Sequence, residues 1–125
     1  MSAGHISNSK DMWKKITGFD DYYVSDKGEV VNRNFRGTGV ERGLKPFKNG
    51  KGYLQVELWR EGKGRKYFVH RLVLEAFCPI EGKYEADHID GCRTNNRLSN
   101  LRWVTSAENK ANPIRLERLR KKRAA

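Results

Sequence analysis

The stretch ADHIDGCRTNNRLSNLRWVTSAEN, residues 86–109, decides the expected fold of the second half of the chain. Two short strands are expected within residues 85–104, around a loop that contains the Asp90-Gly91 turn. The run from Thr105 to Glu108 matches a capping box, which predicts that a helix starts there. The stretch therefore predicts a ββα unit, in which the helix packs across a hairpin.

Polar side chains of this unit are suited to act together on a charged substrate. Asn109 lies about one turn into the expected helix, so it can face the strand that carries Asp87. A carboxylate and an amide oxygen are hard ligands, which suit one Mg²⁺ or Mn²⁺ ion. His88 is the candidate general base, because a neutral imidazole can take a proton from water. Neighbours on a strand point to opposite faces, so Asp87 and His88 can share a site only if the strand ends or twists there.

The residues ahead of this unit predict further antiparallel strands, at 22–25, 29–32, 53–59 and 66–69. In the third of these strands, Leu54, Val56 and Leu58 alternate onto one face. Residues 70–77 have helical spacing, and Pro79 ends that helix. We therefore expect an α+β protein. It divides into an N-terminal antiparallel β module at 12–64, a ββα core at 65–112 and a basic C-terminal tail at 113–125.

The net charge of +11, from 26 basic and 15 acidic residues, indicates a polyanionic partner. Nucleic acid is favoured over a membrane surface, because no basic amphipathic helix with a broad apolar face is evident. No apolar run resembles a signal peptide or reaches membrane-spanning length. The two cysteines, Cys78 and Cys92, are far apart and are expected to be free thiols. These features predict a soluble, intracellular, cytoplasmic protein.

Basic side chains near the expected core and turns are the candidate phosphate contacts. Residues 110–125 hold seven basic residues against one acid, which favours contact with the DNA backbone over a merely solvated tail. Solvated turn charge remains the alternative for the basic residues that flank the earlier turns. The DNA-binding residues predicted from these patterns are Arg102, Lys110, Arg115, Arg118, Lys63 and Arg65.

The pattern of Asp87-His88, Asn100 and Asn109, with Asn-Leu-Arg-Trp-Val-Thr at 100–105, resembles the HNH endonucleases with a ββα-metal site. The likeness is greatest to small phage and intron-encoded homing enzymes. An N-terminal set resembles the nuclease-associated modular domain found ahead of such cores: Trp13, Ile16, Gly18-Phe19, Tyr22-Tyr23-Val24-Ser25 and Gly28-Glu29-Val30.

This resemblance implies metal-dependent hydrolysis of double-stranded DNA, by nicking or double-strand cutting, in a phage-infected bacterial host. It implies that His88 is the base, that Asp87 and Asn109 bind the metal, and that Asn100 holds the loop through hydrogen bonds to backbone. His70 also belongs to the family pattern, as an accessory residue of undefined role. Products with 5′-phosphate and 3′-hydroxyl ends are implied as well.

Two departures from the family matter. Asn109 stands where the family name has a histidine, and no C-terminal DNA-reading module like that of longer relatives is expected after the core. The second departure leaves room for relaxed cutting or for guidance by a phage partner protein. The runner-up hypotheses are a DNA-binding module that keeps the fold without hydrolysis, and an RNA-binding accessory protein.

Other polar and aromatic residues are given structural interpretations. Asn95 and Asn96 are expected to be plain loop residues, and His70 a hydrogen-bonded structural histidine. Trp59 and Trp103 are expected in the core. Zinc is not expected, because the available ligands have no standard zinc spacing: Cys78, Cys92, His70 and His88.

Overall fold

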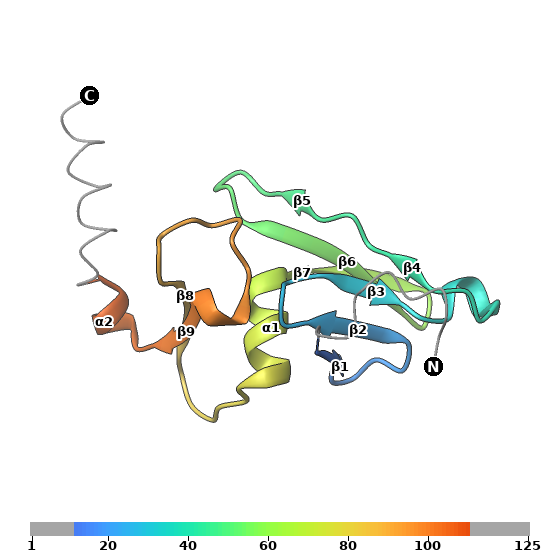
Figure 1. The fold of residues 1–125 in the computed structure, drawn as a ribbon, viewed down its shortest axis with the longest axis horizontal. Coiled ribbons are helices and arrows are strands. Elements are labelled where there is room, and N and C mark those ends of the chain that lie inside the picture. The colour runs from blue at the N-terminus through green and yellow to red at the C-terminus, as the bar shows by residue number, and fades with distance from the viewer. Residues whose placement is uncertain (1–11, 111–125) are drawn as a thin grey trace.

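Helix α1 (Val69–Phe77) lies among three small antiparallel sheets in the computed structural model, which describes residues 12–110 (Figure 1). The first sheet contains β1 (Trp13–Lys15), β2 (Tyr22–Ser25), β3 (Val30–Asn32) and β4 (Arg42–Gly43), in that order. The second contains β5 (Phe47–Lys48), β6 (Leu54–Arg60) and β7 (Lys63–Phe68). The third pairs β8 (Glu85–His88) with β9 (Leu101–Val104). Short 3₁₀ turns occur at η1 (Phe35–Gly37) and η2 (Leu98–Asn100), and α2 spans Ser106–Lys110.

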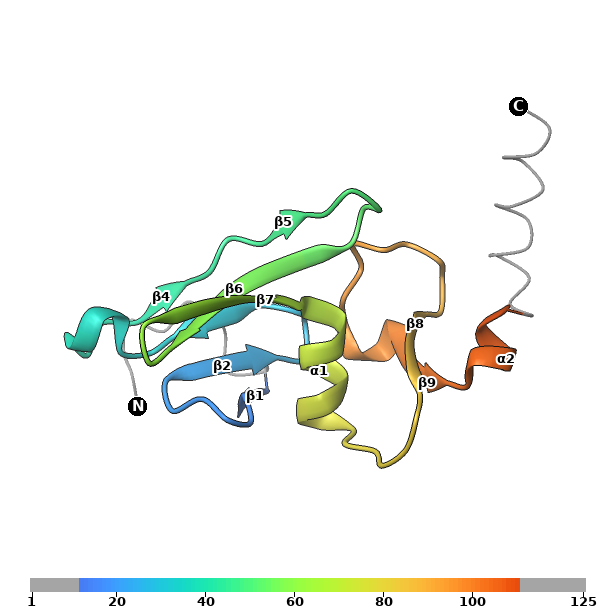
Figure 2. The ribbon, with the colours of Figure 1, turned by 180° about the vertical axis from the view of Figure 1, so that it is seen from behind.

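One apolar core joins the N-terminal sheets to the later elements. Seen from behind, α1 stands between β2 on one side and β8 and β9 on the other (Figure 2). Its buried face, which includes Val69, Leu72, Val73 and Leu74, covers side chains from both halves of the chain. The buried cluster is Ile16, Phe19, Tyr22, Val24, Val30, Val56, Leu58, Val69, Leu72, Val73, Leu74 and Leu101. Neither half therefore buries its apolar face alone.

The hairpin of β2 and β3 is closed by a tight turn at residues 26–28. Ser25 is fully buried, and its Oγ accepts hydrogen bonds from the backbone N–H groups of Lys27 and Glu29. Gly28 takes a φ of 85°, a left-handed conformation that glycine adopts without steric cost. The turn is therefore fixed by its own residues.

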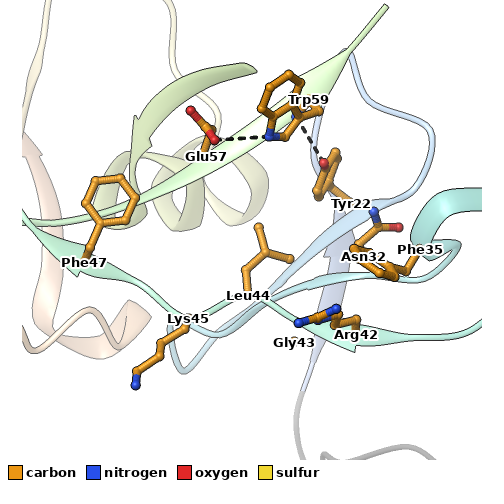
Figure 3. Close-up of a pocket in the computed structure, with 10 residues that line it drawn as sticks. All are labelled: Tyr22, Asn32, Phe35, Arg42, Gly43, Leu44, Lys45, Phe47, Glu57 and Trp59. Atoms are coloured by element: carbon orange, nitrogen blue, oxygen red, sulfur yellow. Dashed lines mark hydrogen bonds between the residues drawn. The ribbon is translucent and has the colours of Figure 1, made fainter. Parts of the chain in front are cut away.

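Trp59 is 54% exposed, so its predicted place in the core is wrong. Its ring lies over Gly64, its cross-strand partner on β7, where a Cβ atom would come within 2.6 Å of the indole. The indole N–H donates to Glu57, and the Trp59 backbone N–H donates to the Tyr22 hydroxyl (Figure 3). Because Gly64 has no side chain, the Trp59 ring can pack against the outer face of the sheet at this position. Trp103, in contrast, is partly buried against the core.

A shallow pocket of about 340 Å³ lies beside Trp59 on the N-terminal module (Figure 3). It is lined by Tyr22, Asn32, Phe35, Arg42, Gly43, Leu44, Lys45, Phe47, Glu57 and Trp59. None of the residues predicted to act as base or metal ligand is among them.

The ββα unit forms as predicted. Thr105 and Glu108 make a reciprocal capping box: the Thr105 N–H donates to the Glu108 carboxylate at 2.9 Å, and the Glu108 N–H donates to Thr105 Oγ1 at 3.1 Å. These hydrogen bonds lower the pKa of the Glu108 carboxyl. The helix they start packs against both β8 and β9. No helix within residues 12–110 is long and apolar enough to cross a membrane.

Candidate active site

His88 is the last residue of β8 and is only 5% exposed. Its Nε2 lies 2.7 Å from Oδ1 of Asn96, which is equally buried. Because an amide oxygen only accepts, this contact requires the proton on Nε2 and leaves the lone pair on Nδ1. The expectation that Asn96 is a plain loop residue is therefore wrong. Its burial depends on a distant part of the fold, which local sequence does not reveal.

His70 on α1 packs beside His88, with ring centroids 4.8 Å apart. It is 6% exposed, and its Nδ1 has no hydrogen-bond partner in the described part of the chain. The hydrogen bond predicted for His70 is absent at this atom. Burial, followed by the charges of His88 and Arg71, lowers the pKa of His70 to about 3. At neutral pH, His70 is an uncharged neighbour of His88.

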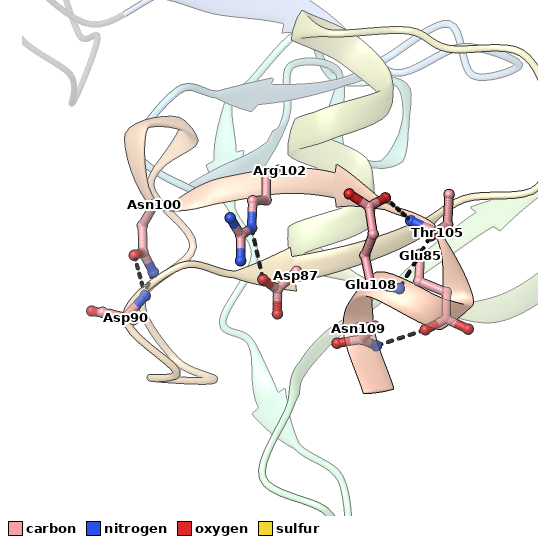
Figure 4. Close-up of polar contacts among 8 residues, drawn as sticks. All are labelled: Glu85, Asp87, Asp90, Asn100, Arg102, Thr105, Glu108 and Asn109. Carbon is pink, nitrogen blue, oxygen red and sulfur yellow. Dashed lines mark hydrogen bonds and ion pairs between the residues drawn. The ribbon is translucent and has the colours of Figure 1, made fainter. Parts of the chain in front are cut away.

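Asn100 fastens the loop between β8 and β9 (Figure 4). Its Oδ1 accepts from the Asp90 N–H at 3.0 Å, and its Nδ2 donates to the Asp90 carboxylate and to the Asn95 carbonyl. Asp90 also accepts from the Cys92 N–H and the Asn95 amide. The hydrogen bonds from Cys92, Asn95 and Asn100 lower the pKa of Asp90. Asn100 thus contacts backbone within the loop, the arrangement that the family resemblance implied for it.

Asp87 and Arg102 form a cross-strand ion pair (Figure 4). Arg102 Nε lies 2.9 Å from Asp87 Oδ2; the Asp87 side chain is 12% exposed and the Arg102 side chain 50%. Arg102, predicted to contact phosphate, is thus held beside the candidate metal ligand.

Asn109 faces β8, as its position in the helix predicted. Its Nδ2 donates to Oε1 of Glu85 at 2.6 Å (Figure 4). Glu85 and Asp87 are two residues apart on β8, so they share one face of the strand. Asn109 and Asp87 therefore lie on the same face of the hairpin. Glu85 was missed by the sequence reasoning, although its spacing from Asp87 was a signal that could have found it.

The donors on this face fit a hard cation that keeps several water ligands. The Asp87 carboxylate and the Asn109 amide offer only oxygen, as Mg²⁺ and Mn²⁺ prefer. Because Glu85 engages the Asn109 Nδ2, the amide oxygen is the atom available for coordination. Between residues 12 and 110, no group of three or more His, Cys, Asp and Glu side chains could hold a metal ion. Cys78 and Cys92 are free and exposed.

The candidate DNA contacts do not gather in one place. Lys63 and Arg65 are exposed on β7, next to the β6–β7 turn, which lies at the opposite end of the molecule from β8 and β9 (Figures 1 and 2). Lys110 is exposed at the end of α2, a helix that packs against β9, the strand that carries Arg102. Arg115 and Arg118 lie outside the described residues. A duplex would have to run along the molecule to meet both groups.

Two family models match the chain. The model of the HNH endonucleases matches residues 67–111. The model of the NUMOD4 motif matches residues 11–59. The first range contains every residue predicted to act as base or metal ligand.

Individual relatives support the same assignment. The DNA endonuclease I-HmuI of Bacillus phage SP01 is 41% identical over 106 residues, which cover 82% of this chain and 57% of that protein. An uncharacterized HNH endonuclease of Acanthamoeba polyphaga mimivirus, L247, is 34% identical over 115 residues, covering 87% of this chain and 27% of that protein. The chain thus spans little more than half the length of I-HmuI.

A solved structure, described as DNA binding and cleavage by the HNH homing endonuclease I-HmuI, matches this fold. The match has a TM-score of 0.75 and 38% sequence identity, and covers 85% of this chain and 59% of that chain. It confirms the predicted α+β fold with antiparallel sheets. With the family model over the ββα unit and the relatives along the chain, it shows that this protein belongs to the HNH endonuclease family.

Proposed function

We propose that this chain is a divalent-metal-dependent endonuclease that hydrolyses DNA phosphodiester bonds, by nicking or by double-strand cutting. The observation that carries the proposal is the placement of Asn109 on the face of β8 that presents Asp87, one residue before His88. The strand ends at His88, and the next N–H, of Ile89, donates to the Asn100 carbonyl. We infer that the end of β8 at His88 lets the Asp87 and His88 side chains serve one site.

In the proposed reaction, His88 Nδ1 takes a proton from a water molecule as that water attacks phosphorus. The P–O3′ bond breaks, which gives a 5′-phosphate and a 3′-hydroxyl. Asp87 and the Asn109 amide oxygen would hold one Mg²⁺ or Mn²⁺ ion, which supplies charge neutralisation at the scissile phosphate and the leaving oxygen. Asn100 keeps the loop in shape, and His70 adds no positive charge beside the base at neutral pH.

Double-stranded DNA is the proposed substrate. The net charge of +11 supports a polyanion, and I-HmuI is described as binding and cleaving DNA. Arg102 and Lys110 are suited to contact phosphates near the scissile bond, while Lys63 and Arg65 would contact the backbone farther along the duplex. By analogy with phage relatives, we propose that the protein acts in the cytoplasm of a phage-infected bacterium.

The test is cleavage of supercoiled plasmid by the full chain with Mg²⁺ or Mn²⁺. Nicked or linear product is expected with metal, and loss of product with EDTA, with His88→Ala or with Asp87→Ala. Glu75→Ala is the matched control, because Glu75 is an exposed residue of α1 whose carboxylate pairs with Arg71 on the same helix. Circular dichroism should show that all variants are folded. Tight duplex binding without metal-dependent nicking would instead support the non-catalytic module, and preference for single-stranded RNA the accessory protein.

A further inference from the structure

The contact between His88 and Asn96 stands out because both side chains are almost completely buried. The 2.7 Å contact joins residues eight positions apart, across the loop that follows β8. The other amide atom of Asn96, Nδ2, is buried without a hydrogen-bond partner in the described part of the chain. Burying an unpaired amide donor costs stability. Asn96 therefore occupies a costly position whose one observed side-chain bond is to the proposed base.

The loop that carries Asn96 rests on the β2–β3 turn of the N-terminal module. A Cβ atom at Gly28 would come within 2.9 Å of both the Asn96 Cβ and the Asn96 carbonyl oxygen. The Asp26 carbonyl accepts a hydrogen bond from the Leu98 N–H at 2.8 Å. Both ribbon views place this turn beside the segment that leads into β9 (Figures 1 and 2). The turn therefore contacts Asn96 itself and also holds the backbone of Leu98, two residues later.

We propose that Asn96 is a positioning residue for His88, and that the β2–β3 turn at Gly28 holds Asn96 in place for that role. Asn96 fixes the Nε2–H tautomer and the ring orientation, so that Nδ1 is the atom that meets the attacking water. The N-terminal module is then part of the catalytic apparatus, in addition to any contact it makes with DNA. The inference rests on the proposed function, in which His88 is the base.

The first experiment reads the tautomer without any cleavage assay. ¹⁵N NMR of the full chain, labelled at histidine, should show His88 with its proton on Nε2 when the ring is neutral. Asn96→Ala should abolish this preference or broaden it into a mixture. A wild-type His88 protonated on Nδ1 would overturn the proposal. Because this readout does not depend on cleavage, it remains decisive if the endonuclease proposal fails.

The second experiment separates positioning from binding. Asn96→Ala should lower kcat by about tenfold or more, within the range that general-base catalysis contributes, and leave KM for DNA unchanged. Asn96→Asp keeps an acceptor oxygen for Nε2–H and should recover part of the lost kcat. An unchanged kcat in Asn96→Ala, or no recovery in Asn96→Asp, would overturn the positioning role.

Gly28→Ala tests the support from the turn, with Gly37→Ala as its control. Both glycines have positive φ, 85° and 72°, but a Cβ at Gly37 meets nothing within 4 Å. Gly28→Ala should lower kcat, whereas Gly37→Ala should not. Adding Gly28→Ala to Asn96→Ala should cost little more, because both act through the same contact. Full additivity in kcat would show that Gly28 does not act through Asn96. If Gly28→Ala fails to fold, the tautomer measurement on wild type and Asn96→Ala still decides whether Asn96 positions His88.

Discussion

Glu85 accepts a hydrogen bond from the Asn109 side-chain amide at 2.6 Å, and this contact sets which end of that amide faces away from the strand. Removing Glu85 should let the Asn109 amide rotate and should weaken metal binding. Glu85→Ala is expected to raise the Mg²⁺ concentration for half-maximal cleavage by about tenfold or more, the usual effect of losing a residue that orients a metal ligand. The measurement is cleavage rate against Mg²⁺ concentration.

Glu57→Ala is a suitable control for Glu85→Ala. Glu57 also accepts from a side-chain N–H, that of Trp59, but lies on the exterior of β6. Its loss should leave the Mg²⁺ dependence unchanged. If the cleavage rate depends on Mg²⁺ concentration in the same way for Glu85→Ala and wild type, Glu85 has no role in metal binding.

Arg102 should compete with the metal for Asp87. Its Nε lies 2.9 Å from the carboxylate, so the guanidinium repels a cation approaching the same group. Arg102→Gln is therefore expected to bind Mn²⁺ more tightly in the absence of DNA, as isothermal titration calorimetry or electron paramagnetic resonance can measure. If Arg102 also contacts phosphate, the slope of log affinity for DNA against log salt should fall by about one. Unaltered Mn²⁺ affinity would show that the ion pair does not limit metal binding.

His70 should make folding stability fall on acidification. Its pKa is lowered to about 3 in the folded protein from 6.5, so below pH 6.5 the unfolded chain binds a proton that the folded chain does not. This contribution to stability is present above pH 6.5 and is lost as pH falls toward 3. Between pH 7 and pH 5 the loss should be about 2 kcal/mol.

Urea unfolding of wild type and His70→Gln at the two pH values isolates the His70 contribution. Glutamine is polar and does not titrate, so the variant should lose less stability than wild type over this interval. An identical pH dependence in the two proteins would mean that His70 is protonated in the folded state.

Lys63 and Arg65 should affect DNA affinity without affecting the chemical step. They lie on β7 next to the β6–β7 turn, which is at the end of the molecule opposite β8 and β9 (Figures 1 and 2). The double variant Lys63→Gln, Arg65→Gln should weaken duplex binding and reduce the salt slope by about two, because two phosphate contacts are lost. Its kcat at saturating DNA should match wild type. Lys15→Gln, a change on exposed β1, serves as the control, and a fall in affinity of equal size there would point to general charge instead.

The parts of the fold that depend on nearby residues could be predicted from the sequence. The capping box at Thr105 and Glu108, the tight turn at Gly28 and the alternation along β6 each follow from a few consecutive residues. The placement of Asn109 against β8 could be predicted as well, because α2 follows β9 directly after Thr105 and β9 pairs with β8. Glu85 could have been found from its two-residue spacing from Asp87.

The errors concern residues whose surroundings come from another segment of the folded chain. Trp59 is large and apolar, but Gly64 gives it a place on the outer face of the sheet. Asn96 is polar and lies in a loop, yet the turn at Gly28 covers it. Neither effect is visible in the local pattern, because each requires knowing which segments touch after folding.

The apolar core shared by both halves of the described chain and the bend at residues 26–28 constrain how this chain can be recombined with others. A chimera that joins the ββα unit to a foreign recognition domain would expose the buried apolar face of α1. It would also remove the contact between the turn at Gly28 and the loop that carries Asn96. The two family models meet near residues 60–66. The folded protein cannot be divided at this point, because the segments on either side depend on each other. Successful recombinants should carry β2, β3 and the bend between them together with the nuclease unit.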